Sequence, residues 1–269
     1  MAKSKSFASR KRASYRASLM LLILWCVATI AGAQMNAAEK KALFDRSNAG
    51  DAAAIETLKK IAGDGDLQAQ TQLGWMYQYG RGVKTENDEA AYWYRRATEK
   101  GNAYAQNQLG LVLCNEWAVL SSHEESERWR TKAAEQGSKY FMYHLARDYE
   151  GGKHCIKKDY KKAMDWYLKA GEQGDYEAFW ALGIMVDYGH GVSKNAIEEY
   201  KWFFLARAVA SVEDDRDGRL SSAISNTARE MTDAQLITAK QVVADWVSAH
   251  STWEWCDSIH LSRNQVCKK

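Results

Sequence analysis

Apolar and small residues recur along this chain at the spacing of a helix, and glycine interrupts them at regular intervals. In the stretch 69–79 the positions that carry them are Ala69, Leu73, Trp75, Met76 and Tyr77. Such spacing forms a stripe on one face of a helix, which must be buried against another element. Gly80-Arg81-Gly82 follows, and glycine tolerates the left-handed conformation that ends many helices. The pattern predicts a helix over 69–79.

A second helix is predicted after this glycine turn. Asn87 or Asp88 can cap its start, because both side chains accept hydrogen bonds from free backbone N–H groups. Its apolar stripe consists of Ala90, Trp93, Tyr94 and Ala97. The small residues Gly74 and Ala97 leave room for the two helices to approach each other closely. The segment therefore predicts a helix–turn–helix unit that ends at Gly101.

This unit recurs along the chain. The glycine that closes it appears at Gly65, Gly101, Gly137 and Gly174, in steps of 36, 36 and 37 residues. The leucine of the first helix recurs at Leu73, Leu109, Leu145 and Leu182, and the tryptophan of the second helix recurs at Trp93, Trp129, Trp166 and Trp202. One unit cannot bury its apolar face alone, so stacked copies are predicted to form an α-solenoid.

The repeated string resembles the Sel-one-like repeat (SLR), a relative of the tetratricopeptide repeat. The residues that carry the resemblance are Leu73-Gly74, Met76-Tyr77, Gly80-x-Gly82 and Trp93-Tyr94 in the first copy, and Leu182-Gly183 and Gly189-His190-Gly191 in the fourth. The second copy departs from the pattern, with Glu116-Trp117-Ala118 in place of the Gly-x-Gly loop.

The resemblance implies an all-α fold, a right-handed α-solenoid of stacked helix-turn-helix repeats with C-terminal capping helices. Within an array spanning 34–210, we expect a half unit at about 37–66 and copies at about 67–102, 103–138, 139–174 and 175–210. Residues 211–269 are expected to form a helical cap and a disulfide tail.

The first 33 residues have the pattern of an export signal. They hold six Lys or Arg and no acid, and an apolar run from Leu19 ends in Ala31-Gly32-Ala33. The run is shorter than the roughly 20 residues that span a bilayer. We therefore expect a signal peptide cleaved after Ala33, a periplasmic or secreted protein, and no stable membrane insertion after cleavage. An uncleaved anchor is the alternative.

Removal of the signal changes the net charge of the chain. The formal charge of +3 falls to −3 when the six cations of residues 1–33 are lost. A mildly acidic protein has no electrostatic basis for binding nucleic acid or anionic lipid. The charge balance therefore argues against a nucleic-acid partner.

Four cysteines remain after the signal, namely Cys114, Cys155, Cys256 and Cys267. An even number in an exported chain predicts two disulfides, for which three pairings exist. We favour Cys256–Cys267, which would close a short C-terminal hairpin, and Cys114–Cys155. In register, Cys114 falls at the end of the first helix of copy two and Cys155 in the loop of copy three. Adjacent copies stack, so the register places these two cysteines close together.

The register also predicts where a partner binds. In the related tetratricopeptide repeat the first helix lines the concave side, through positions two before the repeated leucine and two, five and six after it. The partner-contacting residues expected here are Trp75, Gln78, Tyr79, Asn107, Leu111, Tyr143, Arg147, Trp180, Ile184 and Tyr188. The alternative for Trp75 and Trp180 is packing on neighbouring helices.

The sequence contains no complete catalytic or metal-binding motif among the common ones. The six histidines form no HExxH motif, and no GxSxG, P-loop or GxGxxG occurs. The acidic run 213–218 is similar to the first half of a calcium-binding EF-hand loop, but Ile224 stands where a bidentate Glu is required. We therefore expect no metal, no cofactor and no enzymatic activity.

The sequence thus predicts a periplasmic interaction scaffold that binds a protein or peptide partner. The resemblance implies a narrower version, an immunity protein or inhibitor of a secreted interbacterial toxin. It also implies an alternative, a cysteine-containing enzyme, because cysteine-rich members of the family are linked to penicillin binding and weak β-lactam hydrolysis. A cell-wall protein that binds or hydrolyses peptidoglycan fragments through the aromatic groove is a further alternative.

Overall fold

The computed structural model describes residues 35–115, 122–211, 213–215 and 218–250. Within these ranges the chain forms twelve α-helices and no strand. They are α2 (Ala37–Asn48), α3 (Ala52–Gly63), α4 (Leu67–Tyr79), α5 (Asn87–Thr98), α6 (Ala103–Leu113), α7 (His123–Glu135), α8 (Lys139–Gly151), α9 (Tyr160–Glu172), α10 (Tyr176–Tyr188), α11 (Ala196–Val209), α12 (Arg219–Arg229) and α13 (Asp233–His250). The predicted signal peptide, the loop 116–121 and the Cys256–Cys267 pair lie outside the described residues.

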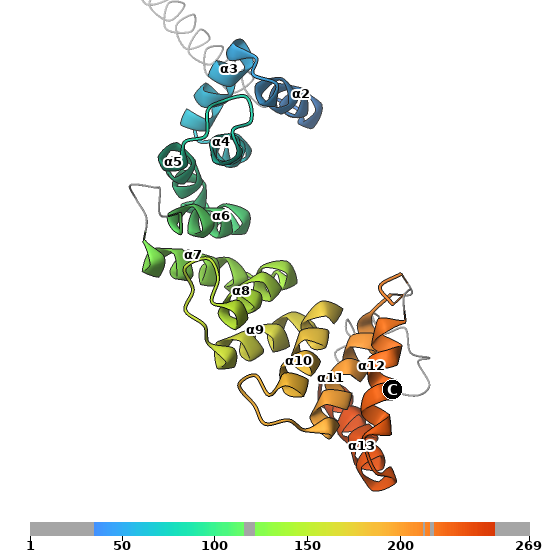
Figure 1. The fold of residues 1–269 in the computed structure, drawn as a ribbon. Helices are drawn as coiled ribbons and strands as arrows, with labels where there is room; N and C mark the ends of the chain where they lie inside the picture. The colour runs from blue at the N-terminus through green and yellow to red at the C-terminus, as the bar shows by residue number, and fades with distance from the viewer. Residues whose placement is uncertain (1–34, 116–121, 212, 216–217, 251–269) are drawn as a thin grey trace, which may run out of the picture.

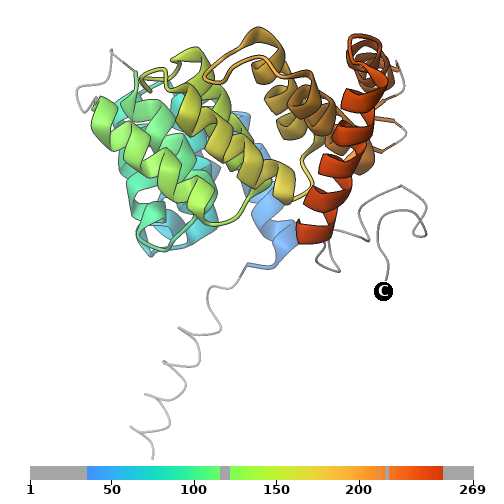
Figure 2. The same cartoon turned by 90° about the horizontal axis from the view of Figure 1, so that it is seen from below.

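Successive helices pack in pairs that stack along an arc. α4 packs on α5, α6 on α7, α8 on α9 and α10 on α11, and each pair contacts the next. The arc is open on one side, with α4, α6, α8 and α10 toward the opening and α5, α7, α9 and α11 toward the outside (Figure 1). α13 lies at the edge of the array in both views (Figures 1 and 2), and it packs on α11, as does α12. The predicted all-α solenoid is confirmed.

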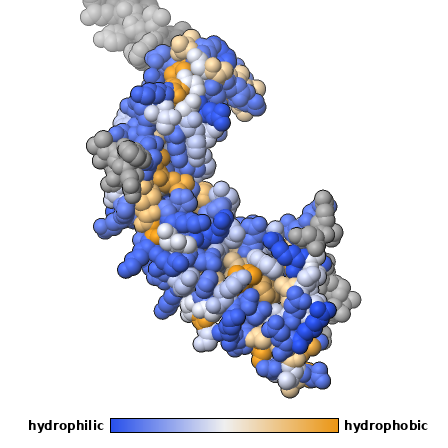
Figure 3. Space-filling model, in the orientation of Figure 1, coloured by the Kyte–Doolittle hydropathy of each residue, from blue (hydrophilic) through white to orange (hydrophobic). Residues whose placement is uncertain are grey.

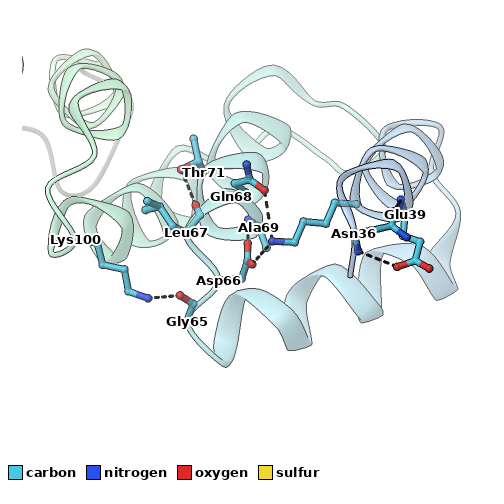
Figure 4. Close-up of polar contacts among 10 residues, drawn as sticks. Asn36, Glu39, Gly65, Asp66, Leu67, Gln68, Ala69, Thr71 and Lys100 are labelled. Atoms are coloured by element: carbon cyan, nitrogen blue, oxygen red, sulfur yellow. Dashed lines mark hydrogen bonds and ion pairs between the residues drawn. The ribbon is translucent and has the colours of Figure 1, made fainter. Parts of the chain in front are cut away.

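A charged cap connects the first two pairs of the array. Asp66 precedes α4, and its Oδ1 accepts a hydrogen bond from the Ala69 N–H at 2.9 Å. Lys40 of α2 places its Nζ 2.5 Å from Asp66 Oδ2, and Lys100 donates to the Gly65 carbonyl (Figure 4). Burial raises the pKa of Asp66, but Lys40 and the Ala69 N–H outweigh it and hold that pKa below its usual value.

In three of the four repeats, a glycine on the inner helix faces a large side chain on the outer helix, and Ala146 stands at this position in the third. A Cβ at Gly74 of α4 would lie 2.6 Å from Cδ1 of Tyr94 on α5. A Cβ at Gly183 of α10 would lie 2.5 Å from Cε1 of Phe203 on α11. Both distances are too short for a real side chain, so the helices can pack this closely only with glycine at these positions.

The Gly-x-Gly loops pack each copy against the pair before it. Gly82 and Gly191 adopt left-handed φ angles of +73° and +78°, which favour glycine. At Gly82 the carbonyl of Ser47, near the end of α2, occupies the space that a Cβ would need. At Gly191 a Cβ would lie 2.6 Å from Cβ of Tyr160, at the start of α9. The second glycine of the loop is therefore needed for both conformation and contact.

Two local features differ from the sequence prediction. The segment expected as a half unit forms two helices, α2 and α3, because Gly50 with φ of +87° permits a tight turn between them. Neither Asn87 nor Asp88 caps α5, which begins at Asn87 with Glu86 as its N-cap and no side-chain cap bond. The Glu86 N–H donates to the Tyr77 carbonyl at 3.0 Å, so the end of α4 fixes where α5 begins.

Replacing Gly82 by alanine tests this loop packing. The new Cβ would meet the Ser47 carbonyl in a left-handed conformation, and we expect a loss of at least about 3 kcal/mol of unfolding free energy. Gly137→Ala is the matched control, because Gly137 has φ of +90° but nothing lies within 4 Å of its Cβ position. It should cost only about 1 kcal/mol. Urea unfolding followed by circular dichroism measures both, and equal losses would contradict the packing role.

Candidate partner-binding groove

The inner helices form the concave surface of the arc. The hollow side is bordered mainly by hydrophilic and intermediate residues (Figure 3). Neither α4 nor α6 contains a charged residue, although 26% of the chain is charged. We call the exposed faces of α4 (67–79) and α6 (103–113) the neutral sector. This part of the concave surface offers hydrogen-bonding groups and aromatic rings without net charge.

The structure places the ten partner-contacting residues predicted from the sequence at different depths. The exposed ones are Tyr79, Arg147 and Tyr188. The half-buried ones are Trp75, Gln78, Leu111, Tyr143, Trp180 and Ile184. Asn107 is only 9% exposed and presents little surface to a partner. The residues chosen from the tetratricopeptide register therefore include some that lie on the surface and some that pack inside the fold.

Gln78 connects two helix pairs beneath the neutral sector. Its Oε1 accepts a hydrogen bond from the Tyr94 hydroxyl of α5 at 2.8 Å, and its Nε2 donates to Gln108 Oε1 of α6 at 3.4 Å. Burial, more than any other cause, raises the pKa of Tyr94 far above its usual value. The hydroxyl therefore stays protonated and continues to donate, which holds the Gln78 amide in one orientation.

Three exposed tyrosines lie together on successive inner helices. Tyr79 of α4, Tyr104 of α6 and Tyr140 of α8 are 51%, 38% and 59% exposed. Burial is the main cause that raises the pKa of Tyr104, and the phenols of Tyr79 and Tyr140 lie close enough to add to it. Tyr104 is therefore neutral at physiological pH and keeps its hydroxyl as a hydrogen-bond donor.

Sequence reasoning did not select Tyr104 and Tyr140. Each stands five residues before a repeated leucine, Leu109 or Leu145. Their spacing of 36 residues matches the repeat and was the available signal. The tetratricopeptide register did not include this position, so the two tyrosines were not selected.

The surface of α8 combines aromatic and charged side chains. The His144 ring lies 4.3 Å from the Tyr140 ring and 5.6 Å from the Tyr143 ring, centroid to centroid. The Arg147 guanidinium lies 5.8 Å from the Tyr143 centroid. Burial, followed by the Arg147 cation, lowers the pKa of His144, so its ring is neutral at pH 7. Burial, followed by Glu177, raises the pKa of Tyr143 to about 12.

Trp180 takes part in packing between helices. Its ring centroid lies 4.8 Å from that of Phe203 on α11, and the Arg219 guanidinium of α12 lies 4.9 Å from the Trp180 centroid. These contacts agree with the alternative interpretation of Trp180, in which it packs on neighbouring helices. Trp75 also packs against two apolar clusters, that of α2 to α4 and that of α5 and α6. Its ring centroid lies 5.8 Å from that of Tyr79 and 5.9 Å from the Arg81 guanidinium.

Cys114 and Cys155 are joined in the structure, with Sγ atoms 2.11 Å apart and Cα atoms 5.5 Å apart. This is the pairing preferred from the sequence. The bond links the C-cap of α6 to the loop after α8. His154, the residue before Cys155, stands at the repeat position of Gly82 and Gly191 and keeps a left-handed φ of +49°. In this copy a disulfide therefore connects the loop to the preceding copy, whereas the loops at Gly82 and Gly191 are connected by close packing at glycine.

Asp215, in the turn before α12, uses its carboxylate oxygens within the fold. Asp215 accepts hydrogen bonds from the Leu220 N–H at 2.8 Å and the Ser221 hydroxyl at 2.7 Å, and its other partner, Arg207 Nε, is 3.1 Å away. Among the described residues, no group of three or more His, Cys, Asp or Glu could hold a metal ion. None of the helices in the described ranges has both the length and the apolar character needed to cross a membrane.

Alanine substitutions distinguish surface tyrosine from packing tryptophan. Trp180→Ala removes a ring packed between α11 and α12 and should cost about 3 kcal/mol of unfolding free energy. Tyr140→Ala removes a ring that is 59% exposed and should cost less than about 1 kcal/mol. Urea unfolding of both variants measures the difference. A Trp180→Ala protein as stable as Tyr140→Ala would show that Trp180 is a surface residue.

A known repeat family and two solved structures are similar to this chain. The Sel1 repeat matches residues 67–102, 103–138, 140–175 and 177–207, which together make up about half of the chain. The repeats therefore coincide with helices α4 to α11.

The crystal structure of a protective antigen present in uropathogenic Escherichia coli strains, which displays an SLR fold, is 25% identical with a TM-score of 0.55. The alignment covers 87% of this chain and 49% of that one, so this chain spans about half the length of the antigen. A Sel1 repeat protein from Oxalobacter formigenes is 24% identical with a TM-score of 0.52, and the alignment covers 79% of this chain and 92% of that one. Both likenesses concern the fold.

Proposed function

Because this chain belongs to the Sel1 repeat family, we propose that it is an interaction scaffold that binds a protein partner through the concave surface of its solenoid. The observation that carries the proposal is the group of three exposed tyrosines, Tyr79, Tyr104 and Tyr140, on successive inner helices. Tyrosine is enriched at binding hot spots, because a rigid ring with a hydroxyl buries a large area at low entropic cost.

The neutral sector fits an uncharged, extended segment of the partner. The oxygens of Gln68 and Gln108 accept hydrogen bonds from Lys40 and Gln78, and their amide nitrogens can donate to a peptide backbone. A surface without charge exerts little long-range attraction on a charged ligand. Binding here should therefore depend on hydrogen bonds and aromatic burial rather than on ion pairs.

The second part of the proposal concerns the compartment in which the partner is bound. The predicted signal peptide would deliver the chain to the periplasm, an oxidising compartment in which the Cys114–Cys155 bond persists. In that setting the scaffold would serve as an inhibitor of a secreted toxin. The aromatic concave surface would then cover part of the toxin.

The test is affinity capture from periplasmic extract with oxidised protein 34–269, followed by mass spectrometry and a Kd for the captured protein. The double substitution Tyr104→Ala/Tyr140→Ala should weaken that binding by at least about 10-fold, because two aromatic contacts are lost. Tyr92→Ala is the matched control. Tyr92 is 51% exposed but lies on α5, an outer helix, and its loss should change Kd by less than about 2-fold.

The outcomes separate the alternatives. A double variant that binds as tightly as wild type would overturn the proposed surface. Raising salt from about 50 to about 500 mM should change Kd less than about 3-fold, whereas a steeper dependence would assign binding to the charged residues of α8. Capture of a toxin supports the inhibitor role. Retention on insoluble peptidoglycan with no captured protein would identify a cell-wall binder instead.

A further inference from the structure

The outer helix α7 differs from the other outer helices in what it buries. The buried residues of α5 are Ala90, Ala91, Trp93, Tyr94, Ala97 and Thr98, and those of α9 are Ala163, Trp166, Tyr167, Ala170 and Gly171. Those of α7 are Ser126, Arg130, Ala133 and Ala134. Among the outer helices of the four repeats, α7 alone buries no large apolar side chain.

Arg130 occupies the place of an aromatic ring. It stands one residue after the repeated tryptophan, where the other copies have Tyr94, Tyr167 and Phe203. The residue is only 3% exposed, and its Cγ and Cδ pack on Gly110 of α6 as Tyr94 packs on Gly74. Its Nη2 pairs with Asp148, while Nε and Nη1 have no hydrogen-bond partner among the residues that the structure describes.

On α8, Asp148 likewise occupies a position that is apolar in the other copies. It stands three residues after the repeated leucine, where the other copies have Met76, Val112 and Met185. Its side chain is 6% exposed and is held by Arg130 and by His154 Nδ1 at 2.7 Å. A buried ion pair therefore crosses from α7 to α8 at a place where the other junctions use apolar contact.

The buried apolar residues of the described chain form three clusters. One boundary falls between α4 and α5, where Trp93 of α5 joins the first cluster, and the other falls at α7. The buried apolar residues of α5 and α6 form one cluster, which Trp129 of α7 contacts from its edge. The residues of α8 to α13 form another cluster, to which α7 contributes Ala134. In stacked repeats, stability is roughly the sum of the contributions of single repeats and of the contacts between neighbours. A junction with little apolar contact is therefore where the array divides most readily.

The disulfide spans this junction. Cys114 follows α6 and Cys155 lies in the loop after α8, so the bond joins the elements on either side of α7. Cys155 and His154 both hold left-handed φ angles, +63° and +49°, which are unfavourable for residues with a side chain. The covalent bond keeps this loop in place without the glycine that copies one and four use.

We propose that α7 is a hinge between two rigid units, 35–115 and 139–250, and that the Cys114–Cys155 bond keeps it closed. A dithiol reductant supplies two electrons and two protons, which yields two cysteine thiols and the oxidised reductant. The α7–α8 junction then loosens. Because Tyr104 lies on one unit and Tyr140 on the other, opening of the hinge separates the exposed tyrosines and changes the concave surface. The hinge itself does not depend on the proposed function of that surface.

Hydrogen exchange with mass spectrometry on the 34–269 protein tests the hinge, with oxidised protein compared with protein reduced by dithiothreitol. On reduction, the amides of α7 and of the first turn of α8 should exchange at least about 10-fold faster. Those of α4 and α10 should change by less than about 2-fold. Cys114→Ser/Cys155→Ser should reproduce the reduced pattern. Unchanged exchange in α7, uniform acceleration along the array, or complete unfolding would each overturn the proposal.

The double substitution Arg130→Tyr/Asp148→Met is the second test, since it gives this junction the residues that the α9–α10 junction has at these positions, Tyr167 and Met185. Replacement of a buried ion pair by well-packed apolar residues is often neutral or stabilising, so this variant is expected to fold. With the disulfide intact or reduced, its α7 amides should exchange at the same rate within about 2-fold. If reduction still accelerates α7 exchange at least about 10-fold in this variant, the polar junction is not the cause of the hinge.

Discussion

In three of the four repeats, the packing of the helix pair depends on a contact between a glycine on the inner helix and a large side chain on the outer helix. Gly74 packs against Tyr94 and Gly183 against Phe203, and these contacts set the distance between the two helices of a pair. The loops at Gly82 and Gly191 set the distance from one pair to the next. Since both spacings are fixed near the backbone, the curvature of the solenoid and the alignment of its exposed tyrosines follow from them.

Arg130 keeps the helix spacing of the repeat but changes the kind of contact. Its methylenes pack on Gly110 as a ring would, so α6 and α7 remain close. The guanidinium then needs a buried partner, and Asp148 on the next copy supplies it. A buried ion pair stabilises the fold only in a geometry that keeps its charges paired and hydrogen-bonded. The middle of the array therefore gains a directional link and loses apolar packing.

Repetition made much of this fold predictable. The recurrence of Leu73, Trp93 and Gly101 gave the solenoid, and the register placed Cys114 beside Cys155, because neighbours in a stack lie one period apart. The depth of each inner-helix residue was not predictable in the same way. One position along a helix rotates a side chain by about 100°, and the period does not fix how the helix is turned about its own axis. Thus Asn107 lies buried while Tyr104, outside the predicted set, lies exposed.

The loop contacts also have a direction along the chain. Gly82 packs against the end of α2, Cys155 bonds to the end of α6, and Gly191 packs against the start of α9. In each case the loop contacts a pair that precedes it. A chain that folds from its N-terminus onward therefore offers each new copy a surface that is already complete. The array can assemble one pair at a time in the order of synthesis, and α12 and α13 complete it by covering α11.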